Sequence, residues 1–210
     1  MKFALMQKQK SPAILKKVTI NNKRQDSSLT QDLGLLVLRL ATGGLLSGHG
    51  SQKVFGWFNG PGLKGTAAWL ESMGMQPGAP WAAAASASEF GGGVLTTLGL
   101  LYPLGPIATI GAMSMATGKV HWGKPIWVTQ GGAELPVTNM AAALTLALAG
   151  PGRFSLDRLF GIRLPRALVI AVVAVEAVMV AIGIMRRPKP QPTPAETVSE
   201  QESTVTSSAS

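Results

Sequence analysis

The sequence of 210 residues contains no cysteine, only two histidines and only one tyrosine. Without a thiol, the chain itself can form no disulfide, perform no thiolate catalysis and ligate no iron–sulfur cluster. A redox function would therefore depend on a bound carrier or on a partner protein.

Charge is also scarce, at 14% of the residues, while 46% are hydrophobic. Between Ser72 and Gly118, Glu89 is the only charged residue. About 20 apolar residues cross a hydrocarbon core of ~30 Å, so this stretch is long enough for two helical crossings. The pattern predicts an integral membrane protein.

Five apolar segments predict an all-α membrane protein, a four-helix transmembrane bundle plus a fifth C-terminal transmembrane helix. The second and third segments are separated by residues 102–106, where two prolines and a glycine interrupt a helix. Residues 150–152, Gly-Pro-Gly, end the fourth, and Glu176 is the one charge within the fifth. The expected spans are residues 33–48, 81–101, 107–120, 135–149 and 167–185.

Composition divides the chain into four regions. We expect a basic, mostly disordered cytoplasmic tail at 1–31 and a four-helix membrane domain at 32–160. A basic linker with the fifth helix follows at 161–185, and a disordered tail rich in Pro, Ser, Thr and Glu at 186–210. The net charge of +9 lies mainly beside apolar spans, so it predicts contact with anionic membrane lipids and no nucleic-acid partner.

The distribution of Lys and Arg also predicts an orientation. Eleven lie on the side of the bundle that holds the N-terminus, against four on the other side. Because basic flanks stay in the cytoplasm, we expect a multi-pass protein of the inner (plasma) membrane with a cytoplasmic N-terminus. Five full crossings would leave Arg186, Arg187 and Lys189 outside, so the fifth helix either crosses as an exception or does not cross fully.

Arg39, Glu89 and Glu176 are ionisable residues that lie well inside the expected spans, away from the ends of the spans. A charge at membrane depth costs about 2.5–3.5 kcal/mol, so each should face a partner or a cavity. From their depths we predict a direct or water-linked pair between Arg39 and Glu89, with a purely structural role as the alternative. For Glu176 we expect a structural or snorkelling role.

Further polar residues gather at the expected outer end of the bundle. His49 and Lys53 end the first span four residues apart, His121 ends the third and Glu134 begins the fourth. Histidine beside carboxylates can relay protons near neutral pH, as quinone chemistry requires. Helix capping is the alternative, and the spacing is not that of a haem or metal ligand set, so we expect neither group.

Four parts of the sequence are distinctive in combination: LLVLRLATGGLLSGHGSQKVFG (35–56), SEFGGG (88–93), His121 and ELPVTNMAAALTLALAGPGRFSLDRL (134–159). Together they resemble the DoxX family of small bacterial membrane proteins, over about residues 32–160. The resemblance implies a four-helix membrane core and a link to respiratory and sulfur redox biology, since the related DoxD proteins resemble the membrane subunit of thiosulfate:quinone oxidoreductase. It also implies a polar set of Arg39, His49, Gln52, Lys53, Glu89, His121 and Glu134.

From these observations we form the hypothesis of a quinone-linked membrane subunit of a redox system, with a soluble or membrane redox protein as partner. Its catalytic candidates are Glu89, His49, Arg39 and His121, with Glu89 and His49 relaying protons and Arg39 holding Glu89 ionised. Its quinone-binding candidates are Gln52, Lys53 and Glu134. Two alternatives remain: a small-solute or proton-coupled transporter, and a non-catalytic membrane anchor for a soluble redox partner.

Overall fold

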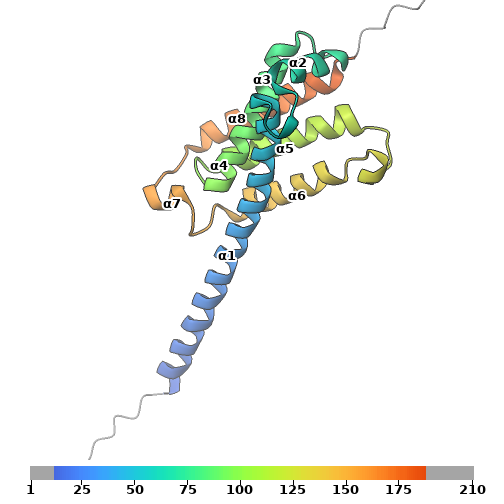
Figure 1. The fold of residues 1–210 in the computed structure, drawn as a ribbon. Coiled ribbons are helices and arrows are strands. Elements are labelled where there is room, and N and C mark those ends of the chain that lie inside the picture. Colours follow the sequence, from blue (N-terminus) through green and yellow to red (C-terminus); the bar gives the residue numbers. More distant parts are fainter. Residues whose placement is uncertain (1–11, 188–210) are drawn as a thin grey trace, which may run out of the picture.

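The structure is a computed structural model that describes residues 12–187. Within this range the chain is helical and contains no strand (Figure 1). The predicted C-terminal tail from residue 188 onward and the first eleven residues lie outside the described residues. The elements are α1 (Pro12–Phe55), η1 (Trp57–Asn59), α2 (Gly62–Ser72), α3 (Gly78–Ser86), η2 (Ala87–Gly91), α4 (Gly92–Leu98), α5 (Leu104–Ala116), η3 (Thr117–His121), η4 (Val128–Gln130), α6 (Glu134–Ala149), α7 (Leu156–Phe160) and α8 (Arg166–Met185).

Five long helical segments occupy the five predicted spans. α3, η2 and α4 follow one another without a break, so they form a single segment whose middle turn is a π-helix, and η3 likewise continues α5. A turn separates α4 from α5 as predicted, but it comprises residues 99–103, and residues 104–106 of the predicted interruption belong to α5. Two helices, Ser28–Phe55 and Arg166–Met185, are long and apolar enough to cross a membrane. Crossing by the other segments stays a prediction.

α1 begins much earlier than the sequence indicated. The prediction of a mostly disordered tail at 1–31 is wrong from Pro12 onward, because α1 extends from Pro12 to Phe55. Proline is well suited to the first position of a helix, and residues 13–33 contain neither glycine nor a further proline to stop it. As a result of this early start, α1 is longer than the other helices, and its first half projects away from them (Figure 1).

Glycine allows α1 and the second helical segment to approach closely in antiparallel directions. A Cβ added at Gly93 would lie 2.5 Å from the Ser47 backbone nitrogen and 2.8 Å from the Gly43 carbonyl oxygen. Farther along, one added at Gly50 would lie 2.2 Å from the Phe90 nitrogen. Small residues are the usual means of close helix packing in membranes. Backbone contact along this line fixes the register of the two helices.

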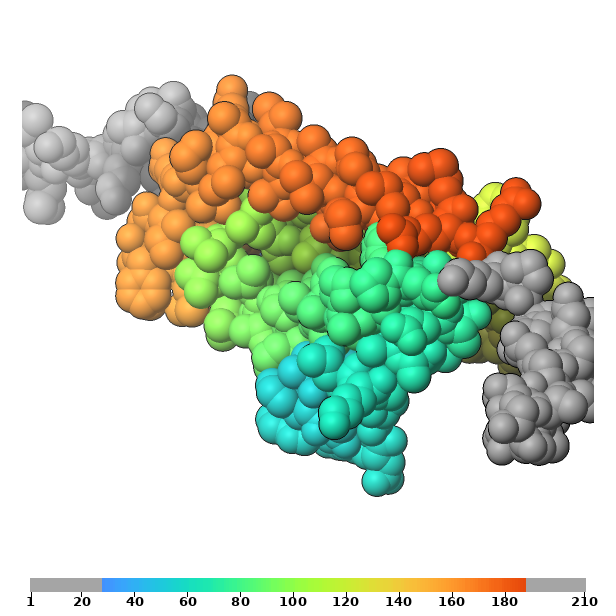
Figure 2. Space-filling view, turned by 90° about the horizontal axis from the view of Figure 1, so that it is seen from above, coloured from blue at the N-terminus to red at the C-terminus, as the bar shows by residue number. Residues whose placement is uncertain are grey.

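α8 runs beside α5 in the same direction. Gly111 of α5 lies against Glu176, and Gly118, two turns later, lies against Ile184. Figure 2 shows α8, orange to red, lying along the green surface of the second and third segments. Its C-terminal end therefore lies at the same end of the molecule as Lys119. Both alternatives that the sequence left open for the fifth helix stay predictions.

The glycine contact between α1 and α4 generates a first prediction. Gly93→Ala should lower the thermal stability of the purified protein in mild detergent, by about 1–3 kcal/mol in the free energy of unfolding, because the new methyl group meets immovable backbone. The matched control is Gly44→Ala, where an added Cβ meets nothing within 4 Å. Equal melting temperatures by circular dichroism for both variants would contradict the packing described.

Candidate functional site

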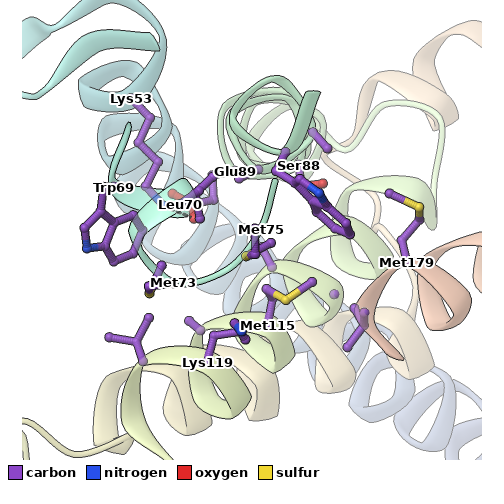
Figure 3. A pocket seen from close by; sticks show the side chains of 18 of the residues that line it. Lys53, Trp69, Leu70, Met73, Met75, Ser88, Glu89, Met115, Lys119 and Met179 are labelled. Carbon is purple, nitrogen blue, oxygen red and sulfur yellow. Dashed lines mark hydrogen bonds and ion pairs between the residues drawn. The ribbon is translucent and has the colours of Figure 1, made fainter. Parts of the chain in front are cut away.

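A pocket lies between the second and third helical segments because these segments separate along their length. They are in close contact where Gly105 meets Gly92 and Thr96, and an added Cβ at Gly105 would lie 2.5 Å from the Thr96 hydroxyl oxygen. Toward Trp81 and Lys119 the two segments diverge, and the space between them is a cavity of about 130 Å³ (Figure 3). α1 and α2 close one side of this cavity, and α8 closes the other.

The walls of the pocket are mainly apolar and rich in methionine and tryptophan. Leu70, Met75, Trp81 and Ala82 form a buried cluster beside it, against which Met115 packs. Methionine adapts its shape readily, and both methionine sulfur and tryptophan rings make favourable contacts with aromatic groups. Five polar residues interrupt this lining: Lys53, Ser88, Glu89, Lys119 and Glu176.

Lys53 and Glu89 form an ion pair at the side of the pocket closed by α1 (Figure 3). Glu89 is only 6% exposed, and its position is set by the π-helical turn η2, a type of distortion that is frequent at functional sites. Lys53 comes from the last turn of α1. Because one charge partly neutralises the other, both can lie against apolar walls at a lower cost than either alone.

The predicted pair between Arg39 and Glu89 is therefore wrong. Arg39, 3% exposed, instead donates to the backbone carbonyls of Thr96 at 3.1 Å, Thr97 at 3.0 Å, Phe154 at 3.1 Å and Pro151. The error has a geometric cause: α1 continues to Phe55, so the helical rise places Lys53 about 21 Å beyond Arg39. Glu89 lies opposite the far end of α1, where Lys53 is the cation within reach.

Asp157 completes this end of the bundle, and the sequence analysis did not identify it. Its carboxylate accepts hydrogen bonds from the backbone nitrogens of Leu101 at 2.8 Å and Tyr102 at 2.7 Å. The Tyr102 hydroxyl donates to the Leu146 carbonyl at 2.9 Å and to that of Ala147, and burial raises the pKa of this hydroxyl, which keeps it a donor. The sequence signal for the short helix α7, which carries Asp157, was its N-cap residue Ser155. The Ser155 hydroxyl accepts a hydrogen bond from the Arg158 backbone nitrogen.

The remaining predicted site residues do not line the pocket. His49 is exposed on α1, and Gln52 lies against the backbone of the loop at Gly60. His121 contacts the Gly131 carbonyl through Nδ1 at 2.6 Å, and Glu134 accepts from the Val128 nitrogen at 2.9 Å. Both of the latter residues thus order the connection between α5 and α6.

The sequence analysis did not assign two of the pocket residues to the candidate site. Lys119 was counted only as a flanking charge, and Glu176 was expected to have a structural or snorkelling role, yet both line the cavity. Gly111 of α5 and Gly118 of η3 lie seven residues apart, and this spacing of small residues was a signal that another helix packs there. It could not reveal that the partner would be the helix that carries Glu176.

The C-terminal end of α8 contacts residues beside the pocket. Arg186 donates to the Gln76 carbonyl and lies over the Trp81 ring, 5.5 Å from its centroid. Lys119 donates to the backbone carbonyl of Arg186. These contacts join α8 to the loop before α3 and to the end of the third segment.

The comparisons with known proteins identify one family. The family model described as DoxX matches residues 34–122, a range that includes Lys53, Glu89 and Lys119 and ends before α6 and α8. No curated protein and no solved structure matches the chain.

The contacts of Arg39 generate the second prediction. Arg39→Lys should lower the free energy of unfolding by at least ~2 kcal/mol, because an ammonium group cannot reach all four carbonyls and each buried carbonyl left unpaired costs ~1–3 kcal/mol. Thermal unfolding in mild detergent would measure this loss against the control Arg158→Lys, an exposed residue of α7. A stability equal to that of the control would show that Arg39 does not hold this end together.

Proposed function

We propose that the chain is a membrane protein of the DoxX family whose pocket binds the ring of a quinone on behalf of a redox system. The observation that supports this proposal is a partly buried Lys–Glu pair at the edge of a cavity whose other walls are mainly methionine, tryptophan and alanine. Such a site combines an apolar surface for a ring with charged groups for the oxygens that the ring carries.

The size of the cavity suits one ring. Its volume of about 130 Å³ is close to that of an engineered cavity of ~150 Å³ that holds benzene. Trp69 and Trp81 offer aromatic faces to the space, and Met73 and Met115 offer flexible thioether side chains. Figure 3 shows Met73 beside Trp69 and Met115 nearer to Met179. A quinone ring would stack among them, while its apolar tail would extend toward lipid.

The ion pair would bind and serve the reacting oxygen. Lys53 can donate a hydrogen bond from Nζ to a quinone oxygen, which stabilises the negative charge that develops there on reduction. Reduction to quinol consumes two electrons and two protons. Glu89 would pass one proton to that oxygen and be reprotonated from the aqueous phase, and the second oxygen would take its proton from the aqueous phase. The electrons would come from a soluble or membrane redox partner.

The proposal assigns this chemistry to fewer residues than the sequence-based hypothesis did. Lys53 and Glu89 keep the roles of orienting the head group and transferring protons. Arg39 becomes a residue of architecture, because its guanidinium is occupied by backbone carbonyls. The proposal gives no part to His49, Gln52, His121 or Glu134, which lie outside the pocket lining.

The ion pair generates the third prediction. Lys53→Met and Glu89→Gln should each raise the Kd for a short-tailed benzoquinone by about tenfold or more, because each removes a charged hydrogen-bonding partner. Quenching of tryptophan fluorescence by the quinone, titrated with purified protein in mild detergent, would measure the Kd. The control is Lys64→Met, an exposed lysine of α2 that does not line the pocket.

A single substitution leaves a buried charge unpaired and so also lowers stability. The double variant Lys53→Met/Glu89→Leu removes both charges together and should regain thermal stability without regaining quinone affinity. Unchanged affinity in the folded double variant, or the absence of binding to the native chain, would refute the proposed site.

A further inference from the structure

The pocket has a second polar end, on the side opposite the Lys53–Glu89 pair. Glu176 reaches the cavity from α8, whereas Glu89 and Lys53 reach it from η2 and α1. Figure 3 shows the two sides: Lys53 and Glu89 lie on one, and Met179, less than one turn beyond Glu176 on α8, lies on the other. Met115 lies between them.

Glu176 is held in place by the absence of a side chain on α5. A Cβ added at Gly111 would lie 1.7 Å from Glu176 Oε1 and 2.4 Å from Cδ, so the carboxyl group fills the space that only glycine leaves. No hydrogen bond or ion pair joins this carboxyl group to any other residue within 28–187. The contact of Oε1 with Gly111 thus fixes the group at the cavity wall, and the carboxyl group has no polar partner there among these residues.

We infer that Glu176 accepts a hydrogen bond from the second hydroxyl of a hydroquinone whose first hydroxyl lies at the Lys53–Glu89 pair. This inference rests on the proposed function and names its substrate class more narrowly. The ligand is a ring with oxygens on opposite sides, because the polar groups of the pocket lie on opposite sides of an apolar middle. A ring with one oxygen would satisfy only one end.

The inference gives α8 a function that its place in the sequence does not suggest. The family match ends at residue 122, so the acid at the second end of the pocket comes from outside the matched region. The contacts of Arg186 with Gln76 and Trp81 hold the helix that carries this acid across the cavity. α8 is then a wall of the binding site as well as a membrane helix.

The fourth prediction tests the second contact with two variants that act in different ways. Glu176→Leu removes the carboxyl group and keeps its approximate size, whereas Gly111→Ala keeps the carboxyl group and displaces it from its seat. Each should raise the Kd for a short-tailed hydroquinone about tenfold, measured anaerobically by tryptophan quenching. Neither should change the Kd for a phenol with the same tail and one hydroxyl. The control is Gly91→Ala, because an added Cβ there meets nothing within 4 Å.

The outcomes separate this inference from the proposed function. If the native chain binds the hydroquinone and both variants keep its affinity, the contact with Glu176 is refuted and the quinone site stands. Equal losses for the hydroquinone and the phenol would also refute it, since a general disturbance of the pocket would be the cause. Failure of the native chain to bind either compound would overturn both.

Discussion

At one end of the molecule the helices are held together by side chains that form hydrogen bonds with backbone groups left without helical partners. Where α4 ends and the chain turns into α5, carbonyl and amide groups lose their helical partners. Arg39 supplies donors for the carbonyls and Asp157 supplies acceptors for the amides. In a hydrocarbon environment irregular backbone is tolerated only when the protein satisfies it internally. These two side chains therefore allow four helical segments to meet at a turn without exposing it.

This tight end makes an open end possible. Glycines bring α4 close to both α1 and α5 near the Arg39 end, and the segments then spread toward Trp81 and Lys119. A bundle that was close-packed throughout would leave no space for a ligand, and one that was loose throughout would have no fixed geometry. The polar groups divide in the same way: Arg39 and Asp157 at the tight end are bonded to backbone groups, while Lys53, Glu89 and Glu176 at the open end line a cavity.

The sequence predicted the helices better than the site. Long apolar runs and the breaks at Pro103 and Gly150 locate the helical segments, because each such signal acts over a few neighbouring residues. Which residues pair across the bundle depends on where each helix ends, and Phe55 could not be identified as the end of α1 from hydropathy. Lys53 was therefore assigned to a quinone head group alone, and Arg39 was paired with Glu89. The place of Glu176 depended on α8 packing beside α5, a relation between distant segments that a single sequence does not show.

The early start of α1 has a consequence for any protein that works with this chain. Asp32 still contacts the body of the molecule, since its carboxylate accepts from the Arg153 nitrogen at 2.8 Å. From Pro12 to Asp32 the helix continues beyond that contact for about 30 Å at the usual rise per residue. If a partner bound near Pro12, the helix would hold it at a fixed distance from the bundle. The number of helical turns between Pro12 and Asp32 would determine that distance.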